Sequence, residues 1–261
     1  MQHPYKKSKL IVKTTIYIFT STLFGVIYHQ FFKNLYIELS EIRISDVIGV
    51  MGTLYSLITA FILVTVWSHF TSTENVFAEE ANALVSLWNF CDYLNSEETT
   101  NKMKPALINY IDSTLNSEFD LLRNQKPVKY PSKELIAIIR VIDKIKFDDP
   151  RDPIAFESIM HAYQKLATAR SQRIKHCKSQ MPGMLRVFYI TASFFFWFGY
   201  LIDGFESFKL YIIILFSVSV LVFLSYIIIH DMDNPLSGAL QISFEDYITT
   251  KEFIIQTKHE V

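Results

Sequence analysis

The chain has 261 residues, of which half are hydrophobic and 15% are aromatic. Its 25 basic and 26 acidic side chains leave a net charge of −1, which gives no basic field for nucleic acid, so we expect no nucleic-acid partner. Seven glycines and eight prolines exclude collagen-like and low-complexity classes, and two cysteines are too few for a disulfide framework. The mean hydropathy of +0.21 beside 20% charged residues indicates that charge is unevenly distributed, as in a membrane protein.

Four stretches are apolar and long enough to cross a bilayer, which requires roughly 20 mostly apolar residues. They are Leu10–Phe32, Val47–Phe70, Met184–Ile202 and Leu210–Ile229. A cleaved signal peptide is a poor interpretation of the first stretch, because its apolar run is too long and no small-residue cleavage site follows. The sequence therefore predicts an all-α, polytopic protein with four transmembrane helices in a lipid bilayer.

Basic residues predict the orientation of these spans. They concentrate in the N-terminal tail and in the segment before the third span, so both termini and the long middle region are expected in the cytoplasm. Helical spans indicate an inner (cytoplasmic) type of membrane rather than an outer one. The predicted organisation is 1–70 for the tail and first two spans, 71–183 for a cytoplasmic helical domain, 184–231 for the last two spans, and 232–261 for a cytoplasmic C-terminal segment.

The middle region has helical periodicity throughout. Its first helix is expected to continue the second span, because no glycine or proline interrupts residues 53–101. Residues three or four apart predict the buried face of this helix: Phe77, Ala81, Leu84, Trp88 and Cys91. Three further helices are expected over 103–122, over 135–145 and from residue 153 on, with Asp152 capping the last of them and Pro153 at its first position.

Enzyme chemistry finds no support in the sequence. It contains no G-x-S-x-G, no H-E-x-x-H and no phosphate-binding glycine loop, so we expect no catalytic activity, no metal and no cofactor. His161, His176 and Cys177 are interpreted as ordinary surface positions of a basic helix.

Charged side chains of the middle region are expected to pair with one another. Either Glu79 or Glu80 is predicted to face the membrane junction and to pair with Arg170 or Arg173.

The second span has an unusual surface. The centres of the spans carry no Asp, Glu, Lys or Arg, which argues against an ion-coupled transporter but not against a passive pore. This span carries a stripe of small or hydroxyl side chains beside bulky apolar ones. The stripe consists of Gly49, Gly52, Thr53, Ser56, Thr59 and Ala60, and the bulky neighbours are Leu54, Leu57, Ile58 and Phe61. Small residues also let membrane helices pack closely, and the pattern alone favours packing over pore lining.

Three short patterns carry a family resemblance. They are an aromatic-ended second span followed by a Glu-Ala helix (GTLYSLITAFILVTVWSHFTSTENVFAEEANALVSLW), an R-x-x-R before a proline (ATARSQRIKHCKSQMPGMLRV), and a D-x-D-x-P-x-x-G after the last span (HDMDNPLSGALQIS). The residues concerned are Trp67, Glu80, Ala81, Arg170, Arg173, Pro182, Asp231, Asp233, Pro235 and Gly238. Together they resemble the bestrophin-like domain family of uncharacterised, mostly bacterial membrane proteins. The chain departs from that family at Leu236, where phenylalanine is frequent, and at Asn89, where arginine is frequent.

This family is distantly similar to bestrophins, which are pentameric chloride channels with four spans per subunit and both termini inside. The resemblance implies a passive anion (chloride-type) channel, a homo-oligomer such as a pentamer, and inorganic anions as the permeant species. It also implies that the second span lines the pore with a bulky apolar neck. The pore and gate candidates are then Thr53, Leu54, Ser56, Leu57, Ile58 and Phe61. Basic residues over 170–178 are expected to raise the local anion concentration.

The likeness to bestrophins extends only loosely to their calcium site. The residues concerned would be Asp231, Asp233, Glu245 and Asp246, and calcium gating is not predicted from them.

The alternative function is a non-conducting membrane scaffold or sensor, whose cytoplasmic helical domain binds a protein partner.

Overall fold

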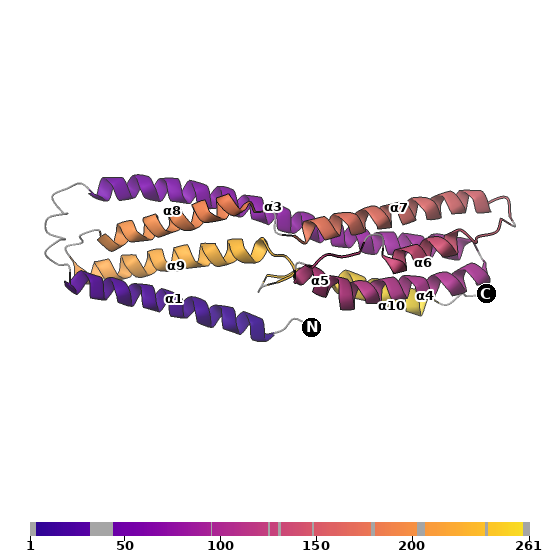
Figure 1. The fold of residues 1–261 in the computed structure, drawn as a ribbon, viewed down its shortest axis with the longest axis horizontal. Coiled ribbons are helices and arrows are strands. Elements are labelled where there is room, and N and C mark those ends of the chain that lie inside the picture. The colour runs from indigo at the N-terminus through magenta and orange to yellow at the C-terminus, as the bar shows by residue number, and fades with distance from the viewer. Residues whose placement is uncertain are drawn as a thin grey trace. The chain divides into compact units, whose positions relative to one another are not determined.

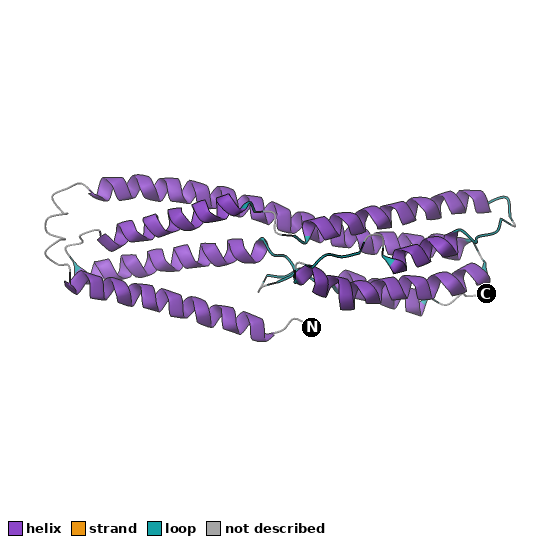
Figure 2. Ribbon diagram, in the orientation of Figure 1, coloured by secondary structure: helices purple, strands orange, loops and turns teal. Residues whose placement is uncertain are grey.

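A computed structural model describes residues 4–31, 44–94, 96–124, 126–129, 132–147, 149–178, 181–202, 207–237 and 240–257. Over these residues the chain forms helices and no strand (Figure 2), which confirms the all-α prediction for this part of the chain. They divide into two compact units, Met1–His69 with Gln180–Leu240 and Phe70–Ser179 with Gln241–Val261. The second unit therefore holds the C-terminal helix together with the helices of the middle region.

The first unit contains α1 (Pro4–Phe31), the beginning of α3 (Ile44–Tyr93), α8 (Gly183–Ile202) and α9 (Phe208–Met232). These helices lie side by side in the order α3, α8, α9, α1 (Figure 1). Gly25 allows α1 to approach α9, because a Cβ at this position would overlap Leu215 Cδ2. Any larger residue at position 25 would have to displace that buried leucine.

Three of the described helices combine the length and hydropathy needed to cross a membrane. They are α3 from Asp46, α8 and α9, which contain the second, third and fourth expected spans. The first expected span lies within α1, which is not among them, and its last residue, Phe32, lies outside the described residues. α1 nevertheless packs along α9, where the ring of Tyr17 stacks on that of Phe223 with centroids 5.8 Å apart. The four-span count stays a prediction.

The second unit contains the rest of α3 and six further helical segments. They are α4 (Glu97–Ser113), the π-helical turn η1 (Thr114–Glu118), α5 (Phe119–Arg123), α6 (Lys133–Ile142), α7 (Asp152–His176) and α10 (Glu245–Gln256). As predicted, α3 runs without interruption from the second span into this unit, and all five residues of its expected apolar face are buried. Ser96 and Ser132 cap α4 and α6 by accepting hydrogen bonds from Thr99 N and Leu135 N.

One expectation for this unit holds with a modification, and another was wrong. The helix expected over 103–122 forms as α4, η1 and α5, which follow one another directly, and the π-helical turn inserts an extra residue into the helical repeat. The N-cap of α7 is Arg151 rather than Asp152. The Asp152 carboxylate instead accepts a hydrogen bond from Asp149 N at 2.8 Å, which closes the turn before the helix.

Lysine side chains of the second unit hold α10 in place. Lys104 Nζ donates to the carbonyl oxygens of Ile255 and Thr257, each at 3.0 Å, and so satisfies the C-terminal end of α10. Lys251 of α10 forms an ion pair with Asp112 of α4 at 2.6 Å. α10 is thus attached to α4 at both of these points.

Replacing Lys104 with methionine should loosen α10 by about 1 kcal/mol, because the last carbonyls of the helix lose a cationic donor. Hydrogen exchange of the amides over 245–256 should quicken accordingly. Lys102→Met is the matched control, since the ion pair of Lys102 joins it to the exposed Glu98 one turn earlier on the same helix. Equal exchange in the two variants would show that Lys104 does not hold the helix end.

Candidate functional site

The membrane part of α3 has one face that packs within the first unit. Ile48, Tyr55, Ile62 and Val66 are buried on this face, at spacings of seven and four residues. The ring of Tyr55 stacks on that of Phe196, with centroids 4.4 Å apart. This face is the packing surface of the helix against α8.

Hydroxyl groups connect the same face of α3 to its neighbours. The hydroxyls of Tyr55 and Tyr189 lie 3.1 Å and 2.8 Å from Ser225 Oγ, and Ser225 donates in turn to Val222 O. In addition, Trp197 Nε1 of α8 donates to Ser219 Oγ of α9 at 3.0 Å. Polar contacts of this kind join helices where water is excluded.

The pore and gate candidates lie away from this packing face. At about 100° per residue, Thr53, Leu57 and Phe61 fall on the opposite side of α3 from Tyr55, while Ser56 and Ile58 flank them. Leu57 and Phe61 are 65% and 69% exposed, and Ile58 is half-buried. Leu54, at 52% exposure, belongs to the same surface. The candidates therefore form a surface that the rest of the first unit leaves uncovered.

The hydroxyl groups on this surface are bonded to their own helix. Thr53 Oγ1 donates to Gly49 O at 3.0 Å, and Ser56 Oγ donates to Gly52 O at 2.8 Å. The two glycines differ, since a Cβ on Gly52 would lie 3.2 Å from the ring of Phe196 whereas one on Gly49 would meet nothing within 4 Å. The packing interpretation of the small residues therefore applies at Gly52, and Gly49 lies on the open side.

A buried cluster of two acidic and two basic side chains lies inside the second unit. Arg173 of α7 donates from Nε to Glu80 Oε2 at 2.6 Å and from Nη2 to Glu118 Oε2 at 2.7 Å. Arg170, one turn earlier, donates to the other oxygen of Glu118 and to Lys129 O. Tyr110 Oη of α4 donates to Glu80 Oε1 at 2.6 Å. The predicted pairing of a glutamate with Arg173 is confirmed, and Glu80 is the glutamate concerned.

Burial and neighbouring charge act in opposite directions in this cluster. Burial raises the pKa of Glu118, but Arg173 and Arg170 outweigh it, so this pKa lies below its ordinary value. Burial, reinforced by Glu80, raises the pKa of Tyr110 and of Tyr247 well above the ordinary value. Burial alone would lower the pKa of Arg173. The nearby Glu80 carboxylate outweighs burial, so the pKa of Arg173 is raised. The Glu118 carboxylate stays ionised beside the arginines, and the phenols of Tyr110 and Tyr247 stay neutral.

Aromatic rings enclose the cluster. The guanidinium carbon of Arg173 lies 5.0 Å from the ring centroid of Phe119, and Phe119 stacks on Phe244 at 4.3 Å and on Phe77 at 5.2 Å. The ring of Tyr247 in α10 stands edge-on to Phe77. These contacts come from α3, α5 and the C-terminal segment, so the cluster joins distant parts of the chain. It is a buried network in which both arginines are paired with carboxylates.

The basic residues over 170–178 were expected to raise the local anion concentration, and the geometry of the cluster corrects this expectation. Arg170 and Arg173 are fully buried and paired with carboxylates, so they add no field for anions, and only Lys175 and Lys178 remain exposed there. Cys177 is also buried, at 7% exposure, and its interpretation as a surface residue was wrong. Burial raises the pKa of Cys177 to about 12.

The first of the two aspartates after the last span bonds to its own segment, and the second connects the end of α9 to the beginning of α8. Asp233 accepts hydrogen bonds from Met181 N at 3.0 Å and from Arg186 Nη2 at 2.6 Å, rather than only within its own turn. Asp231 Oδ2 accepts from Leu240 N at 3.4 Å. Within the described ranges, no three His, Cys, Asp or Glu residues are grouped as metal ligands.

The other motif residues take varied positions. Ala81, Pro235 and Leu236 are buried, whereas Trp67 and Pro182 are exposed. Gly238 lies outside the described residues.

Comparison with known proteins connects this architecture to a family. A family model described as "Bestrophin-like domain" matches residues 15–247. Comparison with curated proteins returns no match.

Solved structures give the fold. A single-substitution variant of a bacterial bestrophin homologue from Klebsiella pneumoniae is 12% identical with a TM-score of 0.71, over 95% of this chain and 98% of that chain. A second variant of that homologue is 11% identical with a TM-score of 0.72, over 95% of this chain and 100% of that chain. A membrane protein with a glycine-to-alanine substitution is 12% identical with a TM-score of 0.73, over 97% of this chain and 99% of that chain. The chain has the bestrophin fold and belongs to the bestrophin-like domain family.

Proposed function

We propose that this protein is a passive anion channel whose pore lies on the symmetry axis of a homo-oligomer. The observation that carries this proposal is the uncovered surface of α3. Leu54, Leu57 and Phe61 are each more than half exposed, opposite the face on which the same helix packs. A subunit with uncharged spans and tightly packed helices offers no path of its own, so a path has to form between copies. The number of copies that we propose is five, by likeness to bestrophins.

The chemistry of this surface suits a weakly selective pore. Bulky apolar side chains around an axis form a constriction that gates by dewetting. The hydroxyls of Thr53 and Ser56 already donate their protons to their own helix, so they have no proton to offer an anion. This surface therefore gives a passing anion no binding site at which it would be retained.

The proposed topology places four spans in the inner membrane with both termini in the cytoplasm. We take α1 as the first of these four spans, because it packs along α9. α9 itself has the length and hydropathy of a membrane helix. The second unit is then a cytoplasmic domain, and its buried ion cluster is a structural element rather than a site for the ion.

Current through planar bilayers containing the purified full-length protein tests the proposal. In asymmetric KCl we expect a reproducible conductance whose reversal potential lies toward that of chloride. Folding of the same preparation is checked from its helical circular dichroism and its oligomeric state in detergent. Silent bilayers from a folded preparation would contradict the channel and favour a non-conducting scaffold or sensor.

A further inference from the structure

The hydroxyl of Ser225 on α9 is shared by side chains from two other helices of the first unit. It donates its single proton to Val222 O of its own helix at 3.0 Å. Its oxygen therefore accepts from its other partners, which are the hydroxyls of Tyr55 on α3 at 3.1 Å and of Tyr189 on α8 at 2.8 Å. Ser225 thus joins α3, α8 and α9 at one point.

Both tyrosines that donate to Ser225 are buried. The rings of Tyr55 and Tyr189 stack on each other, with centroids 6.3 Å apart. A buried hydroxyl that loses its acceptor keeps the full cost of its desolvation, because water does not reach it. Each of the two bonds therefore fixes the position of the helix that supplies the donor.

α3 is attached to its neighbours in the first unit mainly through side chains. Backbones approach closely between α1 and α9 and between α8 and α9, and less so between α3 and these helices. The contacts of α3 with α8 are the stack of Tyr55 on Phe196 and the approach of the Ile48 side chain to Gly199. A helix held in this way depends on a small number of side-chain contacts for its position.

Tyr55 is connected rigidly to the uncovered side of α3. Leu57 follows Tyr55 by two residues, about 200° around the helix, so a displacement of Tyr55 moves Leu57 in the same direction. The hydrogen bond to Ser225 draws Tyr55 toward α9. It therefore holds Leu57 back from the side on which α3 is uncovered.

We propose that Ser225 is a positioning residue that sets the width of the constriction through Tyr55. This inference rests on the proposed channel, in which the side of α3 holding Leu57 and Phe61 faces the path. The bond from Tyr55 keeps α3 close to α8 and α9 and so keeps the constriction wide. Ser225 does not touch the permeating ion and acts only through the position of α3.

Removing this bond should narrow the path. Tyr55→Phe and Ser225→Ala should each lower the single-channel conductance by up to about threefold, the factor equivalent to one hydrogen bond between membrane helices. A narrower path should also lower the permeability of a large anion, methanesulfonate, relative to that of chloride. Partial unfolding would reduce the number of channels but would change neither quantity. Combining the two substitutions should have no further effect, because both remove the same interaction.

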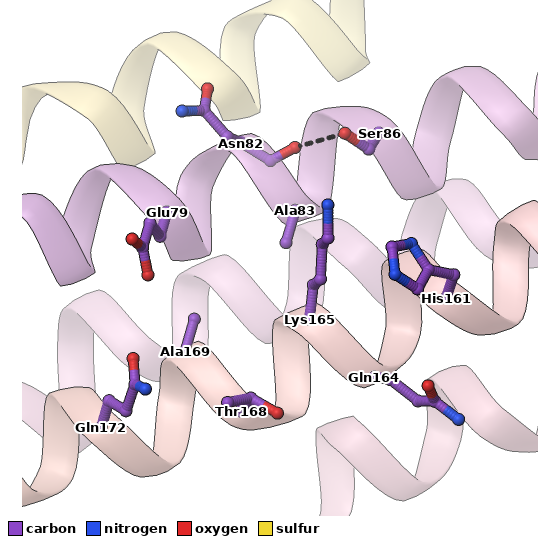
Figure 3. Close-up of a pocket in the computed structure, with 10 residues that line it drawn as sticks. All are labelled: Glu79, Asn82, Ala83, Ser86, His161, Gln164, Lys165, Thr168, Ala169 and Gln172. Carbon is purple, nitrogen blue, oxygen red and sulfur yellow. Dashed lines mark hydrogen bonds between the residues drawn. The ribbon is translucent and has the colours of Figure 1, made fainter.

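Two variants serve as matched controls. Tyr189→Phe removes a hydrogen bond to the same serine but leaves the bond from Tyr55 in place, so it should not move α3. Ser86→Ala removes an exposed serine hydroxyl of α3 in the second unit, where Ser86 donates to Asn82 O one turn earlier (Figure 3). In addition, Ser225→Thr keeps the hydroxyl and should restore the conductance and permeability of the unmodified protein.

Planar-bilayer recordings of the full-length proteins decide the inference. It is supported if Tyr55→Phe and Ser225→Ala lower both quantities while the two controls and Ser225→Thr do not. If Tyr55→Phe behaves like Tyr189→Phe, or if it widens the path, the inference is overturned and the channel is left intact. An unmodified protein that does not conduct would overturn the channel itself, and with it this role of Ser225.

Discussion

Replacing Arg173 with methionine should destabilise the second unit by about 3–5 kcal/mol, the cost of leaving buried charge without its partner. Arg173 donates to both Glu80 and Glu118, and all three side chains are buried. Methionine fills a similar length but offers no donor, so two carboxylates would remain close together beneath the ring of Phe119. Arg173→Lys keeps the charge but loses the planar fork that reaches both glutamates, so it should lie between the methionine variant and the unmodified protein.

The stability of the second unit can be measured through the reactivity of a buried thiol. Cys91 on α3 is fully buried, and burial raises its pKa to about 12, so it should react with an alkylating reagent only when the second unit opens. The rate of modification at Cys91, followed by mass spectrometry across a denaturant series, gives the free energy of opening. Lys102→Met is the control, because its ion pair with Glu98 is exposed to solvent and should contribute little to stability. If Arg173→Met and Lys102→Met protect Cys91 equally well, the cluster does not hold the unit together.

The composition of this cluster shows how far the sequence predicts the site. A pair between Glu79 or Glu80 and Arg170 or Arg173 was predicted, because a glutamate and an arginine in facing amphipathic helices have few other partners. The structure selects Glu80 and Arg173. Glu118 was missed, because the π-helical turn at Thr114–Glu118 shifts the repeat that the apolar residues follow up to that point. Tyr247 was missed because it comes from α10, and no local pattern reports a contact over that separation in sequence.

The basic residues before the third span illustrate the same limit. Composition alone assigns Arg170 and Arg173 to a solvated, positively charged surface. Their burial depends on acceptors from α3, η1 and the segment before α6, which only the tertiary structure brings together. The helices themselves were predicted well, since α3 extends through both units and α8 and α9 fall on two of the expected spans. Helical periodicity is a property of each segment, whereas a buried ion pair is a property of several.

Shortening the apolar side chains on the open side of α3 should increase conductance. We expect Phe61→Ala to raise the current about tenfold, which corresponds to a barrier lowered by about 1.4 kcal/mol. The physical reason is that a wider and less apolar constriction retains water and so costs an ion less of its hydration. Leu57→Ala, one turn earlier on the same side, should act in the same direction by a smaller factor because less volume is removed.

Exposure makes these substitutions informative about the gate. Phe61 is 69% exposed in the subunit, so its truncation leaves no cavity in the first unit and should not unfold it. Phe194→Ala on α8 is the matched control, since Phe194 is also apolar and 54% exposed but lies on a different helix. Planar-bilayer recordings of the three variants separate the two roles that an exposed apolar residue can have in a membrane protein. A current raised at Phe61 and Leu57 but not at Phe194 places the constriction on α3, and unchanged currents at both α3 positions would exclude them from it.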